Sequence, residues 1–324
     1  MSEFSAMLKS FSSFTENLRS PQSKSMRRLK WLAGAATVLL LMTVSVDTKS
    51  FYEFVPQWDA PLVAAVQSEI NRFNGRVGFY LKDLQTGRTL AINADELFPS
   101  ASLVKVPIMM GVFKKIAAGE ISLDTTLVLR RDDKVGGSGI LKRCRSGSRW
   151  TVERLLRLMI SRSDNTAARM LVNLTGIPYL NSTFQSLDLQ VTRVQEEPLF
   201  RLTPDVSVEN YTTPREMARL LENLYHGGCI TPESSQRMMD IMKKGKARHR
   251  LARYLPRGWE IADKTGLLRG ACHHIGIVFT PHGNFLICVL TADNTDSEYG
   301  RAKQFIARVG RKVFRHRRDE YRHS

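Results

Sequence analysis

A serine and a lysine lie three residues apart in a stretch that is otherwise apolar. The stretch FPSASLVKVPIM, residues 98–109, contains Ser102 and Lys105. Positions i and i+3 of a helix share a face, so the Ser102 hydroxyl and the Lys105 amine can meet. A serine hydroxyl is a weak nucleophile that needs a base, and burial lowers the pKa of a lysine amine towards that task. We therefore predict that Ser102 is a nucleophile and that Lys105 is its base.

Two tripeptides further along the chain place polar groups next to predicted elements. Ser-Asp-Asn at 163–165 follows the apolar helical segment LLRLMI, and Lys-Thr-Gly at 264–266 ends a predicted strand that begins at Trp259. Each tripeptide alone is more often an ordinary polar loop. In this order after the Ser-x-x-Lys at 102–105, they are a strong signal for acyl transfer through a serine.

These motifs make the sequence resemble the class A β-lactamases and their penicillin-recognising serine hydrolase relatives. The similarity covers roughly residues 60–316 and includes the stretches DLQTGRTLAIN, GSGIL, TVERLLRLMISRSDNTAARML, VTRVQEEPLF and NYTTPREMARLL. The resemblance implies an enzyme that opens a small-molecule β-lactam ring through an acyl-enzyme on Ser102. We expect no metal and no other cofactor.

The resemblance also implies roles for residues of the second and third motifs. Ser163 would relay a proton to the leaving lactam nitrogen, and the backbone N–H groups of Ser102 and Leu267 would form an oxyanion hole. Asn165 would bind the substrate amide, while the Lys-Thr-Gly segment would hold its carboxylate. The predicted substrate-binding residues are Asn165, Lys264, Thr265, Gly266 and Leu267.

Hydrolysis of an acyl-enzyme needs a base that activates water, which the resemblance implies is a glutamate on the loop after Ser-Asp-Asn. The segment QEEPLF offers Glu196 and Glu197, and the family's Glu-Pro pattern favours Glu197. The loop is about one residue shorter than the common pattern. Arg201 stands where the family has an asparagine that orients the water, so Glu196 remains the alternative.

A second departure concerns the arginine that pairs with the substrate carboxylate in familiar β-lactamases. The matching segment here is CHHIGIV, which puts Ile275 or a histidine near that place, with Arg269 on the preceding loop as a substitute. We predict that His273 and His274 are loop residues that bind no metal.

The cysteines have no metal-ligand spacing and none is predicted to be catalytic. Export would permit disulfides, and three pairings remain open. The four cysteines are Cys144, Cys229, Cys272 and Cys288.

Hydrophobic periodicity predicts the elements that must position these residues. Residues 61–73 have the pattern of an amphipathic helix, and residues 76–84 and 88–93 alternate as a strand hairpin. Helical periods occupy about 102–245, with start signals at Thr151, Thr213 and Thr231. Three more strand-like segments follow at 259–266, 275–280 and 285–292. We predict an α+β fold: an antiparallel five-stranded sheet of N- and C-terminal segments, flanked by helices, with an all-helical lobe inserted.

The N-terminal segment has the character of a targeting sequence. Residues 1–30 carry six Lys or Arg against two Glu, and residues 31–46 contain no charge. Such a flank keeps the N-terminus in the cytoplasm. We predict a basic cytoplasmic leader at 1–30, a membrane anchor or signal segment at 31–46 and an exported catalytic domain at 47–324. An uncleaved inner-membrane anchor, with the domain facing the periplasm or cell exterior, is favoured over cleavage and secretion.

The chain is strongly basic, with a net charge of +17. Its last 24 residues, 301–324, carry nine Lys or Arg against two acids and have the pattern of an amphipathic helix. Because no recognition motif or interleaved aromatic residues accompany this charge, nucleic acid is not expected as a partner. Contact with anionic lipid or wall polymer is the preferred reading, and the protein is expected to be a monomer.

Two alternative functions remain open from the sequence. A penicillin-binding D-alanyl-D-alanine carboxypeptidase acting on peptidoglycan peptides would share Ser102, Lys105, Ser163 and Lys264 but would not need Glu197. A silent wall-binding or scaffold protein could keep the fold, although it would have no reason to keep all three motifs.

Overall fold

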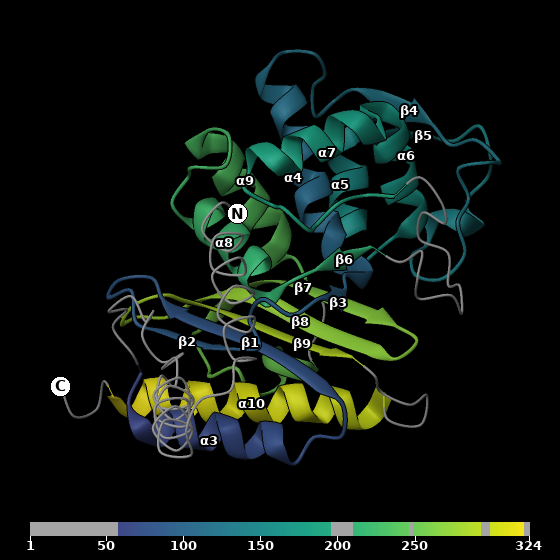
Figure 1. Cartoon of the computed structure of the whole chain (residues 1–324). Coiled ribbons are helices and arrows are strands. Elements are labelled where there is room, and N and C mark those ends of the chain that lie inside the picture. The colour runs from purple at the N-terminus through teal and green to yellow at the C-terminus, as the bar shows by residue number, and fades with distance from the viewer. Residues whose placement is uncertain (1–57, 196–209, 246–248, 293–298, 321–324) are drawn as a thin grey trace, which may run out of the picture. The chain divides into compact units, whose positions relative to one another are not determined.

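A five-stranded antiparallel sheet separates two layers of helices in the computed structural model, which describes residues 58–195, 210–245, 249–292 and 299–320 (Figure 1). The strand order is β2-β1-β9-β8-β7. The strands are β1 (Arg76–Asp83), β2 (Thr89–Ile92), β7 (Glu260–Leu268), β8 (Ala271–Phe279) and β9 (Phe285–Ala292). The predicted α+β fold is confirmed. The N-terminal strand β1 pairs with the C-terminal strand β9, so segments from both ends of the domain form one sheet.

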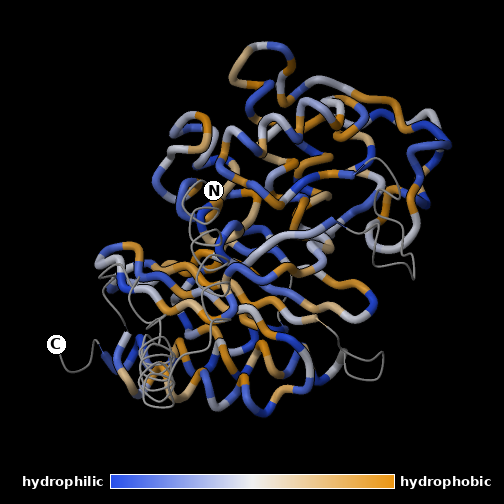
Figure 2. Tube along the Cα trace, viewed as in Figure 1, coloured by the Kyte–Doolittle hydropathy of each residue, from blue (hydrophilic) through white to orange (hydrophobic). Residues whose placement is uncertain are grey.

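The central strands β8 and β9 are apolar along almost their whole length because both faces of the sheet are covered. Every residue of β9 is buried, as is every residue of β8 except Phe279. A strand with one wet face would instead alternate apolar and polar residues. Figure 2 shows the apolar character running through these central strands and into the helices above them.

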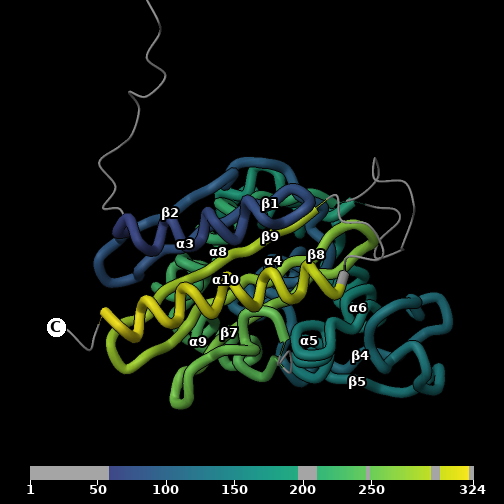
Figure 3. The backbone as a smooth tube through the Cα atoms, turned by 90° about the horizontal axis from the view of Figure 1, so that it is seen from below, coloured from purple at the N-terminus to yellow at the C-terminus, as the bar shows by residue number. Residues whose placement is uncertain are grey.

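One face of the sheet is covered by α3 (Ala60–Asn71) and the long α10 (Tyr299–Glu320), which lie side by side in Figure 3. Asp59 caps α3 by accepting a hydrogen bond from the Leu62 N–H at 3.1 Å. The core of this layer is apolar: Leu62, Val66, Phe79, Phe285, Phe305, Val309 and Phe314 are buried together. The predicted terminal amphipathic helix is therefore present.

The other face carries the inserted lobe. Its helices are α4 (Lys105–Ala117), α5 (Val152–Ser161), α6 (Asn165–Thr175), α7 (Ile177–Ser186), α8 (Pro214–Tyr225) and α9 (Pro232–Lys243). The predicted start signals are confirmed, because Thr151, Thr213 and Thr231 each accept a hydrogen bond from a backbone N–H in the first turn of the helix that follows.

The lobe also contains two short antiparallel ladders that the helical periods did not indicate. One pairs β3 (Phe98–Pro99) with β6 (Tyr211–Thr212), and the other pairs β4 (Thr126–Val128) with β5 (Arg149–Thr151). Short 3₁₀ helices occur at Ala101–Val104, called η2, at Leu141–Arg143, called η3, and at Arg250–Tyr254, called η5.

The leader at 1–30 and the uncharged run at 31–46 lie outside the described residues. Within the part of the chain that is described, no helix has the length and apolar character needed to cross a bilayer. All four cysteines lie in described segments and are free thiols rather than disulfide partners.

Candidate active site

Ser102 lies in η2, directly before α4 begins at Lys105. The preceding residue, Ala101, has φ of +48°, in the left-handed region that a residue with a side chain rarely adopts. Such a backbone conformation costs about 1 to 3 kcal/mol and persists where the surroundings enforce it. The turn holds the half-buried Ser102 at the start of a helix whose first nine residues, 105–113, are all buried.

Lys105 is completely buried and its amine is surrounded by acceptors from two motifs. Its Nζ lies 3.2 Å from Ser102 Oγ, 2.7 Å from the Ser163 carbonyl oxygen and 2.6 Å from Asn165 Oδ1. Burial lowers the pKa of Lys105 well below its usual range, and the positive charge of Lys264 lowers it further. The predicted pairing of Ser102 with Lys105 is present, and the pKa of the lysine amine is lowered.

Ser163 stands in the turn between α5 and α6 with φ of +52°. Its Oγ lies 3.2 Å from Lys105 Nζ and 3.1 Å from Lys264 Nζ. A single hydroxyl therefore joins the lysines of the first and third motifs. Asn165 begins α6, and its amide nitrogen donates to the Gly136 carbonyl oxygen at 2.9 Å.

The turn that carries Ser163 is held by the buried carboxylate of Asp164. This carboxylate accepts hydrogen bonds from the N–H groups of Ala167, Ile140 and Leu141 at 3.0, 2.6 and 3.0 Å. A Cβ on Gly139 would come within 2.2 Å of Asp164 Cγ, so only glycine fits there. The stretch GSGIL is thus a support for the Ser-Asp-Asn turn.

Lys264 comes from β7, the edge strand whose neighbour on the lobe side is η2. Its Nζ also donates to the Thr265 carbonyl oxygen at 2.8 Å. Burial lowers the pKa of Lys264 to about 7; the charge of Arg250 lowers it too, whereas Asp263 opposes the shift. Leu267, three residues along the strand, exposes 43% of its surface.

The two histidines are strand residues, so their predicted place in a loop is wrong. Both lie in β8 and are inaccessible to solvent, because the paired strands on either side and the layers above and below enclose them. The Nδ1 of His273 accepts from the Thr291 N–H at 3.2 Å, so its Nε2 carries the proton that bonds the Pro99 carbonyl oxygen at 2.7 Å. Burial lowers the pKa of His273 to about 4.

His274 points to the opposite face of the sheet from its neighbour. Its Nδ1 accepts from the Leu251 N–H at 3.2 Å, and its Nε2 bonds Asp263 Oδ2 at 2.6 Å. Burial lowers the pKa of His274, although the adjacent Asp263 carboxylate raises it. His274 therefore links β8 to η5 and to the residue preceding Lys264.

None of the residues suggested for the carboxylate-binding arginine provides a buried cation beside Lys264. Ile275 is apolar, and the two histidines favour the neutral form. Arg269 is exposed on the β7–β8 turn, five residues and roughly 17 Å along the strand from Lys264.

Arg250, which the sequence reasoning missed, is a buried cation behind β7 and β8. It is 3% exposed and donates from Nη1 to the His273 carbonyl oxygen at 3.1 Å. Its charge lowers the pKa of Lys264, so the two groups interact electrostatically. The sequence contains no signal that separates Arg250 from the exposed arginines around it, because only the fold buries it.

Ser102, Lys105, Ser163, Asn165 and Lys264 are thus brought together, with Thr265, Gly266 and Leu267 continuing along β7. Glu196 and Glu197 lie outside the described residues. The arrangement joins a serine hydroxyl, a desolvated amine, a second hydroxyl for proton transfer and a cation. This is the set of groups that acyl transfer through a serine requires.

Comparison with known proteins agrees with this arrangement. A sequence model of the Beta-lactamase enzyme family matches residues 61–317. Beta-lactamase AER-1 of Aeromonas hydrophila is 27% identical over 288 residues, covering 87% of this chain and 93% of the relative. The structure of PBP-A has 28% identity and a TM-score of 0.74, covering 82% of this chain and 98% of that chain.

An ancestral class A β-lactamase has 29% identity and a TM-score of 0.72, covering 78% of this chain and 98% of its own. The fold and the family match therefore both identify the class of protein as β-lactamase. The chain belongs to the β-lactamase enzyme family, and the resemblance to its class A members is confirmed.

Proposed function

We propose that this protein is a serine β-lactamase of the class A type, which opens the β-lactam ring through an acyl-enzyme on Ser102. The observation that carries the proposal is the position of the Lys105 amine, fully buried and 3.2 Å from Ser102 Oγ. The lowered pKa of Lys105 favours the neutral amine that can accept the serine proton.

Acylation then follows from the geometry. Lys105 takes the proton of Ser102 as Oγ bonds to the lactam carbonyl carbon, and the backbone N–H groups of Ser102 and Leu267 stabilise the developing oxyanion. Ser163 Oγ contacts Lys105 Nζ, so it can pass a proton to the lactam nitrogen as the C–N bond breaks. The product of this stage is an ester on Ser102.

Substrate carboxylate is held at β7 in this proposal. Lys264 and Thr265 supply the direct contacts, and the buried Arg250 adds positive potential from behind the strand in place of the family's usual arginine. Deacylation uses Glu197 as the base that activates water, with Glu196 as the alternative.

The alternative function is a penicillin-binding D-alanyl-D-alanine carboxypeptidase. It is supported by the similarity to PBP-A, a mutant of which was solved as an acyl-enzyme complex with penicillin G. Such an enzyme would form the same ester but release penicillin slowly. The β-lactamase is preferred because the family match and the curated relative are β-lactamases.

Export through residues 31–46 is part of the proposal. The uncharged run follows a basic flank, which favours a cytoplasmic N-terminus and a catalytic domain outside it. Protease added to spheroplasts should degrade residues 47–324 and spare the first 30. A catalytic domain protected from external protease would contradict export.

The decisive experiment measures hydrolysis of a chromogenic cephalosporin together with the mass of the penicillin-treated protein. The wild type should turn over, and Ser102→Ala should lose both turnover and the adduct. Ser100→Ala, which alters a hydroxyl two residues away, is the matched control and should keep both. An adduct that persists in Ser102→Ala would remove Ser102 from the mechanism, and slow release by the wild type would favour the carboxypeptidase.

A further inference from the structure

The outer face of α10 carries a straight row of arginines, which we call the arginine stripe. Its members are separated by 7, 3, 4 and 3 residues, so they share one side of the helix and span about 26 Å. The opposite side of α10 is buried on the sheet. The arginine stripe comprises Arg301, Arg308, Arg311, Arg315 and Arg318.

Among the described residues, Arg308, Arg315 and Arg318 of the stripe share two carboxylates, those of Glu69 and Asp319. Arg308 pairs with Glu69 at 2.8 Å, whereas Arg315 and Arg318 both approach the single carboxylate of Asp319, at 3.6 and 3.5 Å. Over the whole of α10 there are eight Lys or Arg against two acids, a net charge of +6. The side chain of Arg315 is 76% exposed.

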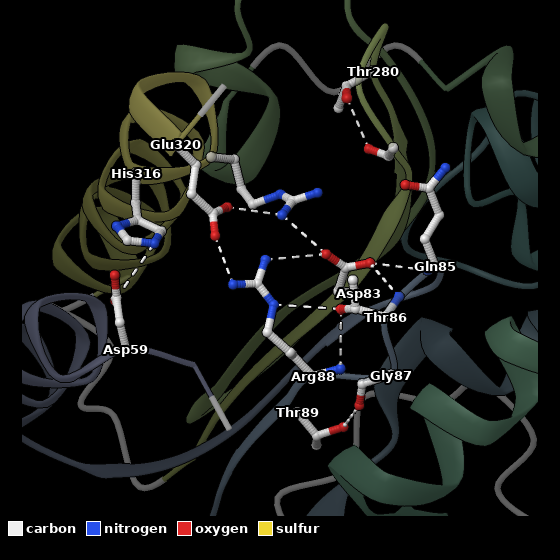
Figure 4. A network of polar contacts seen from close by, with 12 residues as sticks. Asp59, Asp83, Gln85, Thr86, Gly87, Arg88, Thr89, Thr280, His316 and Glu320 are labelled. Carbon is white, nitrogen blue, oxygen red and sulfur yellow. Dashed lines mark hydrogen bonds and ion pairs between the residues drawn. The ribbon is translucent and has the colours of Figure 1, made fainter. Parts of the chain in front are cut away.

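Arg317 lies on the inner side of the same helix and, unlike the stripe, is enclosed by the fold. Arg317 is buried, and its Nη1 lies 2.9 Å from both Asp83 Oδ2 and Glu320 Oε2. Arg88 joins the same two carboxylates, in the network seen in Figure 4. The buried Arg317 therefore meets two carboxylates on its own side of the helix, whereas Arg308, Arg315 and Arg318 of the outward-facing stripe share two among the described residues.

The position of the stripe points to a membrane. In the sequence, twelve residues, 47–58, separate the uncharged run 31–46 from the Asp59 cap of α3, and α3 packs beside α10. Twelve residues span at most about 42 Å. A domain tethered there could lay its α3–α10 layer on the lipid surface, with the catalytic lobe on the far side of the sheet (Figure 1).

We propose that the arginine stripe is the surface through which the catalytic domain binds an anionic phospholipid membrane. The contact is electrostatic, because α10 buries its Phe305 and Phe314 in the fold instead of offering them for insertion. Phe305 and Phe314 are likewise unavailable for stacking on the bases of single-stranded nucleic acid. The inference builds on the proposed anchor but does not depend on catalysis.

The test uses the fragment 47–324, which contains both helical layers, the sheet and their cores. Its binding to vesicles of phosphatidylcholine with and without 30% phosphatidylglycerol, a composition of about one anionic lipid in three, is measured by sedimentation at low and high salt. We expect binding only to the anionic vesicles and release by salt. The binding variant combines Arg301→Gln, Arg311→Gln, Arg315→Gln and Arg318→Gln, which leaves the Arg308–Glu69 pair intact.

Each charge near an anionic surface strengthens binding by about fivefold, so this variant should bind more than a hundredfold more weakly. The matched control removes four exposed arginines from the lobe: Arg131→Gln, Arg143→Gln, Arg145→Gln and Arg149→Gln. It should bind as the wild type does. Equal loss in both variants, wild-type binding by the stripe variant, or binding to purified sacculi but not to vesicles would overturn the proposal. Thermal melting of each variant confirms folding, and failure of β-lactam turnover would leave these vesicle results unaffected.

Discussion

Lys105 and Lys264 place their side-chain nitrogens 3.2 and 3.1 Å from the same atom, Ser163 Oγ. Both lysines are buried, and the charge of Lys264 lowers the pKa of Lys105. Two buried ammonium groups so close together repel each other, so the state with one neutral amine is favoured. Ser163 thereby connects a base to a cation that can hold a carboxylate.

The pH dependence of kcat/KM should be bell-shaped. On the acidic side, activity rises with pH as Lys105 loses its proton and becomes able to act as a base. On the alkaline side, activity falls as Lys264 loses its charge, with a midpoint near its pKa of about 7. Bound substrate carboxylate stabilises the charged lysine, so the alkaline limb of kcat should lie at higher pH than that of kcat/KM.

Lys264→Arg tests the alkaline limb, because a guanidinium keeps its charge at that pH. Substrate binding should weaken, since the shape of the group changes, but the fall in kcat/KM should move to higher pH. Steady-state rates at constant ionic strength between pH 5 and 10 are the measurement. An alkaline limb at the wild-type position in Lys264→Arg would assign it to another group.

Lys105→Arg should abolish rapid acylation. The substitution keeps the positive charge but removes an amine that can become neutral, so the loss should be on the order of 10² to 10⁴ in the acylation rate. Lys114→Arg, which changes a half-buried lysine in the last turn of the same helix, is the control and should acylate normally. Rapid-mixing measurement of adduct formation decides the point, and near-normal acylation in Lys105→Arg would place the base elsewhere.

His273 should act as a positioning residue for Ser102. Its imidazole joins the Thr291 N–H in the sheet to the Pro99 carbonyl oxygen, three residues before Ser102. His273→Gln keeps a donor for Pro99, whereas His273→Asn keeps only the acceptor for Thr291. We expect the acylation rate of the Gln variant to exceed that of the Asn variant at similar thermal stability, and equal rates would reduce His273 to a purely structural role.

His273 should also make the free energy of unfolding depend on pH. Its pKa is about 4 in the fold against the ordinary 6.5, so between these pH values the unfolded chain binds more protons than the native one. The free energy of unfolding should therefore fall as pH drops through this window, by about 3 kcal/mol from His273 alone. Urea unfolding at pH 7 and pH 4.5 measures the loss, which should be smaller in His273→Gln.

Glu197→Gln should acylate normally and then stall. Removing the base that activates water lowers deacylation by roughly 10² to 10⁴, so the penicillin adduct should persist for minutes while the wild type clears it. Time-resolved mass spectrometry of the intact protein follows the adduct. Glu196→Gln is the neighbouring control; stalling there instead would shift the assignment by one residue.

Much of the site could be predicted because its signals are local. The spacing of Ser102 and Lys105 puts their side chains on one helical face in any helix that contains them. The apolar residues around Lys105 implied burial, and the threonine caps marked where helices begin. Strand periodicity likewise predicted the five strands, since a sheet covered on both sides leaves long apolar runs.

The environment of β8 and η5 was decided only by the tertiary structure. His273, His274 and Arg250 are polar residues that look like surface groups in the sequence, yet β9, β7 and the layers on both faces enclose them. Whether a polar side chain is buried depends on which distant segments cover it and which backbone groups satisfy its hydrogen bonds. Here the Thr291 and Leu251 N–H groups, 18 and 23 residues from their histidine partners, supply those bonds, and no local pattern encodes such pairings.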